Sequence, residues 1–368
     1  MQKHYDTEDK PKKAFLVSLS GENDELFGLA QSLGLDIVCH EKIRIREKNP
    51  KFGMGSGKAA ELSQKAAELQ ADCIVFDWEP SPSQQRNWEE MAGIPLLDRQ
   101  ELIIRIFEQR ANTREAELQV KLAELSYFLP RLTHKYIDLS RQRGGRYGTK
   151  GSGETKLETD RRLVEQRIRR LEKEIEEVGK QRKTQRRQRE RQGLPVCAIV
   201  GYTNSGKSSL LNALTGAGVL AEDKLFVTLD AVTRRFQPAP GVPALLTDTV
   251  GFIRRLPHSL ITAFRSTLEE AALADILIHI LDAAEADIDS NYQTTFSVLR
   301  ELGAQNIPML TVLNKIDRFP SDEESQAALH EVESRFPESV AVSVKNGTGL
   351  DVLKEKIALM IKELRPSE

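Results

Sequence analysis

One eight-residue segment constrains the fold of this chain more than any other. Residues 201–208 read GYTNSGKS, which matches G-x-x-x-x-G-K-[ST], and they lie between an apolar stretch, VCAIV, and a helix-like stretch, KSSLLNAL. A strand that turns through such a loop into a helix directs backbone N–H groups at a phosphate group. The segment therefore predicts a P-loop in an α/β domain, with Lys207 at the β- and γ-phosphates and Ser208 on Mg²⁺.

Three further motifs follow in the order that a guanine-nucleotide site requires. Asp248–Gly251 (DTVG) ends an apolar strand, so that its carboxylate can hold Mg²⁺ through water and the Gly251 N–H can meet the γ-phosphate. Asn314–Asp317 (NKID) ends another strand, and Asp317 can accept from N1–H and the 2-amino group of guanine, which adenine does not offer. Ser343–Lys345 (SVK) can close over the base. Together these motifs predict GTP and GDP as ligands.

Two places in this domain decide how hydrolysis would proceed. The segment from Lys224 to Arg235 must supply a threonine for Mg²⁺, and both Thr228 and Thr233 are candidates that spacing does not separate. Ras-like enzymes place a glutamine after the DTVG-type motif to orient the attacking water. Here the residue is Phe252, which can neither donate nor accept a hydrogen bond. We therefore expect slow hydrolysis unless a partner or a rearranged segment positions the water.

The rest of the chain predicts two more regions, which is consistent with a length of 368 residues. Strand-like stretches starting at residues 14, 35, 71 and 94 alternate with helix-like ones, so residues 1–99 predict a small parallel α/β domain. Residues 100–192 predict an antiparallel hairpin of two long helices, one of them running through residues 100–129 and the other through 155–192. Residues 193–368 are expected to form a Ras-like P-loop GTPase domain of the α/β class, the G domain, with a short C-terminal extension.

The second helix carries apolar residues at alternating steps of four and three, which is a heptad seam over residues 164–178. The expected connection, residues 130–154, contains five glycines and a basic cluster, Arg141, Arg143, Arg146 and Lys150. From 141 to 191 there are 18 basic and 9 acidic residues, whereas the net charge of the whole chain is −2. This local excess predicts an anionic partner. Because few aromatic residues lie nearby, folded RNA is a better match than exposed bases.

The N-terminus, MQKHYDTEDKPKK, is polar, and no apolar run approaches the roughly 18 residues needed to span a bilayer. We therefore expect a cytoplasmic protein without an integral membrane segment.

Four tracts together resemble the HflX family of ribosome-associated GTPases: FVTLDAVTR, DTVGFIRRLPH, TREAELQVKLAELSYFLPRL and GSGETKLETDRR. The resemblance runs from about residue 14 to the end of the P-loop domain. It implies a protein that binds the large ribosomal subunit, dissociates stalled or stress-arrested ribosomes, and hydrolyses GTP to GDP and phosphate faster when bound there. It also implies that the basic loop touches rRNA and that Thr228 is the switch threonine. We expect a monomer and no DNA partner.

On this basis we expect Lys207, Thr228, Gly251 and Phe252 to govern catalysis, and Ser208 and Thr228 to ligate Mg²⁺. The expected nucleotide contacts are Gly201, Tyr202, Thr203, Asn204, Ser205, Gly206, Lys207, Ser208, Ser209, Phe226, Val227, Thr228, Leu229, Asp230, Asp248, Thr249, Val250, Gly251, Asn314, Lys315, Asp317, Ser343, Val344 and Lys345.

Weaker signals allow other interpretations. Gly53-x-Gly55-x-Gly57-Lys58 resembles a phosphate loop, but Ala59 replaces the hydroxyl residue, so a turn into a helix is favoured over a second nucleotide site. A lone His258 is assigned no role. The alternative function is a GTP-regulated module that binds a protein through the heptad seam, although such a module would not need the basic loop. An RNA-modifying enzyme would need a cysteine or carboxylate constellation that the sequence does not offer.

Overall fold

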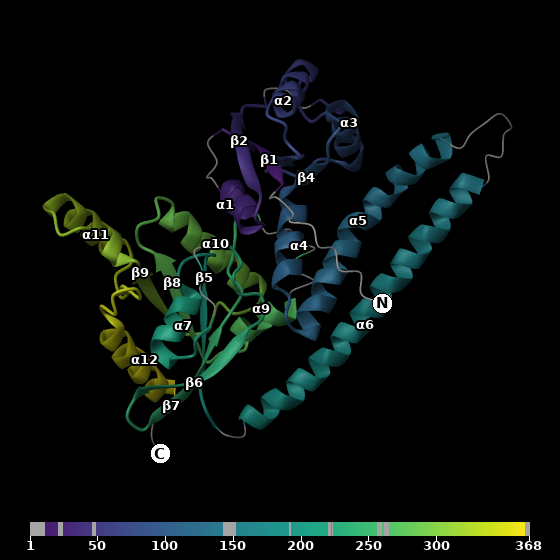
Figure 1. Ribbon diagram of the computed structural model, residues 1–368. Helices are drawn as coiled ribbons and strands as arrows, with labels where there is room; N and C mark the ends of the chain where they lie inside the picture. Colours follow the sequence, from purple (N-terminus) through teal and green to yellow (C-terminus); the bar gives the residue numbers. More distant parts are fainter. Residues whose placement is uncertain are drawn as a thin grey trace. The chain divides into compact units, whose positions relative to one another are not determined.

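The computed structural model describes residues 12–20, 25–45, 49–142, 152–190, 193–219, 222, 224–255, 260 and 265–364 (Figure 1). The chain forms two compact units. The first contains Met1–Gln109 and Val120–Lys173, and the second contains Arg110–Gln119 and Glu174–Glu368. None of the described helices is long and apolar enough to cross a membrane.

The N-terminal part of the first unit is a four-stranded sheet in the order β2-β1-β3-β4, with every neighbouring pair parallel. Its elements are β1 (Lys13–Leu19), α1 (Glu25–Ser32), β2 (Asp36–Ile43), α2 (Ser56–Glu68), β3 (Cys73–Phe76), α3 (Pro82–Ala92) and β4 (Leu96–Asp98). Trp88 is fully buried against Phe76 and Phe52 at the centre of its core. The alternation of strand and helix in the sequence thus produces the expected parallel α/β fold.

The expected single helix over residues 100–129 is corrected to two, α4 (Arg99–Arg110) and α5 (Arg114–Gln142). The break falls at residues 111–113, where Thr113 caps α5. Its hydroxyl accepts the Ala116 N–H at 3.2 Å, and its carbonyl accepts the Glu117 N–H at 2.9 Å. A threonine side chain at this position satisfies an N–H that has no partner within the helix, so it favours a new helix start over continuation.

The expected loop over residues 130–154 is corrected too, because α5 continues past Pro130 to Gln142 and α6 (Ser152–Glu190) already begins at Ser152. Arg141 therefore lies in the last turn of α5, while Arg143, Arg146 and Lys150 lie outside the described residues. The two helices run in opposite directions (Figure 1), and Arg114 of α5 donates to Glu174 of α6 at 3.3 Å. In the seam of α6, Leu171 is buried.

The second unit carries a six-stranded sheet in the order β10-β9-β8-β5-β7-β6. Its elements are β5 (Val196–Gly201), α7 (Lys207–Thr215), β6 (Val232–Ala239), β7 (Val242–Asp248), α9 (Arg265–Ala272), β8 (Ile276–Asp282), α10 (Ile288–Glu301), β9 (Met309–Asn314), the 3₁₀ turn η1 (Ile316–Arg318), α11 (Glu323–Arg335), β10 (Val340–Ala341) and α12 (Leu350–Leu364). All pairs are parallel except β6 with β7. The antiparallel edge strand β6 is not among the strands that the sequence predicted.

Helices cover both faces of this sheet. Ile278 and Ile280 of β8 share one core with α7 and α12, and Leu281 shares another with Ile288 of α10 and Val332 of α11. A parallel sheet buried on both faces leaves its carboxyl edge as the open place for a ligand. The P-loop, the DTVG motif and the NKID motif all begin at that edge.

Candidate nucleotide-binding site

The P-loop joins β5 to α7 through a backbone that only small residues allow. Asn204 has φ 62° and Gly206 has φ 103°, both in the left-handed region. A Cβ atom on Gly206 would lie 2.3 Å from the Asn314 side-chain nitrogen. The glycine therefore lets the loop lie directly against the motif that follows β9.

Lys207 opens α7 and is almost entirely buried. Its Nζ donates to the Tyr202 carbonyl at 2.7 Å, which is a contact within the loop itself. Burial lowers the pKa of the Lys207 ammonium to about 8, although the Asp248 carboxylate opposes this change. An anionic phosphate beside this nitrogen would offset the desolvation of its charge, so the loop is built for an anion.

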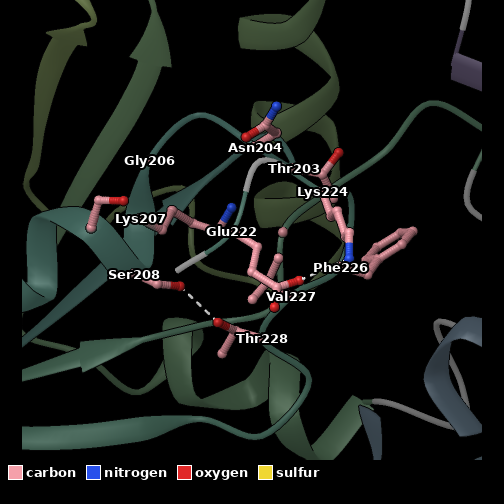
Figure 2. A pocket seen from close by; sticks show the side chains of 12 residues that line it. Thr203, Asn204, Gly206, Lys207, Ser208, Glu222, Lys224, Phe226, Val227 and Thr228 are labelled. Carbon is pink, nitrogen blue, oxygen red and sulfur yellow. Dashed lines mark hydrogen bonds and ion pairs between the residues drawn. The ribbon is translucent and has the colours of Figure 1, made fainter. Parts of the chain in front are cut away.

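Three oxygen-bearing side chains converge beside Lys207, as Figure 2 shows for Ser208 and Thr228. The Ser208 and Thr228 hydroxyl oxygens lie 2.7 Å apart, and they approach Asp248 Oδ2 at 2.6 and 3.2 Å. The other oxygen, Asp248 Oδ1, is buried and has no hydrogen-bond partner among the described residues. Burial raises the pKa of the Asp248 carboxyl, against the opposing charge of Lys207.

This cluster fits the Mg²⁺ ion that a P-loop implies. Mg²⁺ takes oxygen ligands, usually one or two protein groups together with substrate phosphates and waters. Ser208 and Thr228 offer hydroxyl ligands, and the unsatisfied Asp248 oxygen can accept from a metal-bound water. No cluster of three or more His, Cys, Asp or Glu side chains suited to a metal occurs in the described ranges.

The structure separates the two threonines that spacing left open. Thr228 reaches Ser208, whereas the Thr233 hydroxyl lies in β6 and pairs with the Thr247 hydroxyl of β7 at 2.9 Å. Of the two, only Thr228 has its hydroxyl in the cluster with Ser208 and Asp248.

The motifs after β9 and β10 are held to the P-loop by hydrogen bonds. Asn314 donates to the Ser205 carbonyl at 2.9 Å and accepts the Val344 N–H at 3.1 Å. Lys315 Nζ lies 2.7 Å from the Asn204 carbonyl. The Ser343 hydroxyl donates to Asp317 Oδ1 at 2.6 Å, which links the motif after β10 to the motif after β9.

The pocket of Figure 2 is lined by ten of the expected residues and by two that the sequence did not indicate, Glu222 and Lys224. The ten are Thr203, Asn204, Gly206, Lys207, Ser208, Ser209, Phe226, Val227, Thr228 and Gly251. Glu222 accepts from Arg110 at 3.2 Å and lies 3.3 Å from Lys224 Nζ. No motif marks these two, and only their place just before the switch threonine could have pointed to them.

Comparisons with known proteins agree with this geometry. Family models described as GTP-binding GTPase N-terminal, GTP-binding GTPase Middle Region and 50S ribosome-binding GTPase match residues 21–108, 110–189 and 196–315. A "GTPase HflX" of Akkermansia muciniphila is 45% identical over 98% of this chain and 87% of its own length. The "GTPase HflX" of Escherichia coli is 39% identical over 95% and 83%. The chain belongs to the HflX family of GTPases.

Solved structures of GTP-binding proteins share this fold. A GTP-binding protein from Sulfolobus solfataricus in complex with GDP has 26% identity and a TM-score of 0.50, covering 96% of this chain and 99% of its own. A second GDP complex, of SsGBP, has 26% identity and a TM-score of 0.54.

In this HflX-family chain the residue after the DTVG motif is turned away from the pocket. Phe252 is 1% exposed, and its backbone pairs with the P-loop strand: Phe252 N–H donates to Gly201 O at 3.1 Å, and Thr203 N–H donates to Phe252 O at 2.7 Å. A Cβ on neighbouring Gly251 would lie 2.7 Å from Lys207 Nζ. The segment thus brings a backbone N–H beside the P-loop while the aromatic ring lies in the core.

Two other sequence features lie elsewhere. In the N-terminal domain Lys58 pairs with Glu61 at 2.7 Å and with Glu41 at 3.6 Å. The glycine-rich stretch, in which Met54 is buried, leads directly into α2. This agrees with the favoured interpretation, a turn into a helix. His258 lies outside the described residues.

Proposed function

We propose that this protein is a Mg²⁺-dependent GTP switch that binds the large ribosomal subunit and dissociates stalled ribosomes, with hydrolysis stimulated by the ribosome. The observation that carries the first part is the convergence of Ser208, Thr228 and Asp248 beside Lys207. The partner is supported by the family model over residues 196–315, which is described as a ribosome-binding GTPase. A cytoplasmic location and a monomeric state belong to the same proposal.

The residues suggest how each part of the nucleotide is held. Lys207 lines the pocket and can reach the β- and γ-phosphates there, and Gly251, which lines the same pocket, can offer its N–H to the γ-phosphate. Mg²⁺, when bound, neutralises phosphate charge. Asp317 accepts hydrogen bonds from N1–H and the 2-amino group of guanine. Asn314 and Lys315 hold the NKID motif against the P-loop through the Ser205 and Asn204 carbonyls.

Water positioning is the missing element. Because Phe252 is both apolar and buried, nothing from that position orients a nucleophilic water in the free protein. Turnover should therefore be slow until the ribosome supplies or orders a positioning group. Such groups supplied by partners raise hydrolysis by roughly 10³–10⁵ in other GTPases.

The test is single-turnover GTP hydrolysis with and without purified large subunits. We expect strong stimulation in the wild type. Thr228→Ala should lose most of the stimulated rate but retain GDP binding, because its hydroxyl acts only in the closed, Mg²⁺-bound segment. Equal rates for the free protein and the complex would contradict this account of Phe252.

The ribosome part is tested separately by sedimentation with ribosomal subunits over a salt series. We propose that Arg141, Arg143, Arg146 and Lys150 contact rRNA, so replacing all four with alanine should weaken binding and flatten its salt dependence. A matched control replaces four exposed basic residues of the G domain with alanine: Arg235, Arg300, Arg335 and Lys362. If the fourfold variant binds as the wild type does, the basic loop is not the anchor.

A further inference from the structure

The chain between α4 and α5 contacts the switch segment, by which we mean residues 222 and 224–230, including Thr228. Both oxygens of Asp230 are held from this break: the Thr113 hydroxyl donates to Oδ1, and the Asn112 N–H donates to Oδ2 at 3.3 Å. Asp230 is two residues after Thr228. The same Thr113 hydroxyl accepts the Ala116 N–H, so one side chain both caps α5 and holds the switch segment.

A second contact lies on the other side of Thr228. Arg110 Nη2 donates to Glu222 Oε2 at 3.2 Å, and the Arg110 side chain is only 18% exposed. This guanidinium, together with Lys224, lowers the pKa of the Glu222 carboxyl. The pairs Arg110–Glu222 and Thr113–Asp230 therefore flank the nucleotide-facing residues of the segment.

Between these contacts the segment packs inward. Phe226 and Leu229 are each 2% exposed, and Phe226 has φ 57°, a conformation that costs energy for an aromatic residue unless its surroundings hold it. With Phe226 and Leu229 buried, Thr228 lies between them with its hydroxyl on Ser208. The position of that hydroxyl thus depends on a strained stretch held from both ends.

We propose that Thr113 and Arg110 are positioning residues for the GTPase reaction: through Asp230 and Glu222 they hold the switch segment in the conformation in which Thr228 ligates Mg²⁺. This inference rests on the proposed role of Thr228. Only GTP offers a γ-phosphate for the closed segment to meet, so the contacts favour GTP over GDP. Because such coupling is reciprocal, GTP in turn strengthens the hold on the start of α5.

The test is a double-mutant cycle on the full-length protein with Thr113→Val, Asp230→Ala and the double variant. Affinities are measured with a fluorescent non-hydrolysable GTP analogue and with fluorescent GDP, both with Mg²⁺. Thr113→Val also removes the α5 cap, but that loss occurs in both backgrounds and cancels in the cycle. We expect a coupling factor of roughly fivefold for the GTP analogue, at the low end for coupled sites because the pair is exposed, and none for GDP.

The Arg110–Glu222 pair provides a second measurement that does not touch the helix cap. Arg110→Glu should lower the preference for the GTP analogue over GDP, and Arg110→Glu combined with Glu222→Arg should restore it. The control is Arg335→Gln, which breaks an exposed pair with Asp289 at 2.7 Å elsewhere on the domain and should leave the preference unchanged.

The outcomes separate this inference from the proposed function. A wild type that binds no GTP overturns both. A wild type that binds GTP, with equal coupling for GTP analogue and GDP and no recovery in the charge-swapped variant, overturns only the positioning role of Thr113 and Arg110. Thr113→Ser, which keeps the hydroxyl, should retain the wild-type preference, whereas a role limited to packing would depend on the lost methyl group.

Discussion

Both sheets of this protein place carboxylates at the ends of their strands, yet the two sets are used differently. In the N-terminal domain, Asp77 follows β3 and accepts from Arg99 Nη1 at 2.8 Å, while Arg99 Nη2 donates to Glu25. In the G domain, Asp248 ends β7 with one oxygen on the Ser208 and Thr228 hydroxyls. Its other oxygen has no partner among the described residues.

A second carboxylate of the N-terminal domain follows the same rule. Asp98 ends β4 and accepts from Tyr127 OH at 2.9 Å, from Arg131 Nη2 at 3.0 Å and from the Glu101 N–H at 2.8 Å. The Arg131 guanidinium also lies 3.6 Å from the Tyr127 ring centroid. These partners come from α4 and α5, so the strand-end carboxylates of this domain fasten its own helices.

The difference shows what makes a strand end a ligand site. Position at the carboxyl edge of a parallel sheet is common to both domains. In one, the chain itself brings a guanidinium to each carboxylate: Arg99 to Asp77 and Arg131 to Asp98. In the other, a buried lysine and an unsatisfied carboxylate oxygen remain beside a glycine-rich loop, and only an added phosphate and cation would complete them.

The largest expected effect is on base recognition at the open site. Asp317→Asn replaces an acceptor with an amide, so the preference should move from guanine toward xanthine nucleotides. A site that hydrogen-bonds a group of its ligand rejects an analogue that lacks it, and because Asp317 is exposed we expect a loss of GTP affinity of about 10²-fold or more rather than that of a fully buried site. Competition binding with GTP, XTP and ATP measures it.

The matched control is Asp98→Asn in the N-terminal domain, which should leave nucleotide preference unchanged. Loss of guanine preference in both variants would mean that the two strand-end carboxylates are not functionally distinct, and the comparison would fail.

The next effect is on stability at the filled site. Arg99→Leu leaves Asp77 and Glu25 without their guanidinium, and stranding a buried charge costs about 3–5 kcal/mol. Both tryptophans of the chain, Trp78 and Trp88, belong to the N-terminal domain, so urea unfolding followed by tryptophan fluorescence reports on it selectively. GTP affinity should not change.

Arg86→Leu is the control for that variant, because Arg86 forms a solvent-accessible pair with Glu90 at 3.7 Å and is far less buried than Arg99. Its cost should stay below about 1 kcal/mol. If Arg99→Leu costs no more than Arg86→Leu, the buried network does not hold the domain together.

Sequence reasoning predicted this contrast only in part. The P-loop and the DTVG and NKID motifs are local and carry their own chemistry, so the α/β fold of the GTPase domain followed from them, while the family followed from four longer tracts, two of which lie in the helical region. The four-stranded N-terminal sheet followed from the alternation of strand and helix. Neither pattern shows that Arg99 pairs with Asp77 or that Arg131 reaches Asp98, since those partners are 22 and 33 residues apart and are brought together by packing.

The misjudged elements have local causes. The break at residues 111–113 interrupts an amphipathic pattern that continues on both sides, and only the capping hydroxyl of Thr113 reveals it. The loop was expected to begin at residue 130, yet α5 continues through Pro130. Strand β6, VTRRFQPA, is an edge strand that buries few side chains, so its hydrophobic signal is weak.

The smallest effect sharpens the comparison through pH. Burial raises the pKa of the Asp98 carboxyl to about 6, against the opposing pull of the Glu101 N–H and Arg131. A raised folded-state pKa means that the folded domain binds more protons than the unfolded chain between pH 4 and 6. The contribution of Asp98 to stability is therefore fully present below about pH 4 and is lost as the pH rises through 6.

The measurement is the difference in unfolding free energy between the wild type and Asp98→Asn, followed by tryptophan fluorescence from pH 4 to 8. Other carboxylates titrate in both proteins and cancel. Relative to Asp98→Asn, the unfolding free energy of the wild type should fall by about 1–3 kcal/mol between pH 4 and 6 and stay constant above pH 6.5. A level difference throughout would mean that Arg131 and Tyr127 fully compensate the burial of Asp98. Asp98 would then be as well paired in the folded domain as a carboxylate that binds a ligand. The two sheets would differ only in the source of the positive charge, which is an arginine of the chain at Asp98 and a bound cation at Asp248.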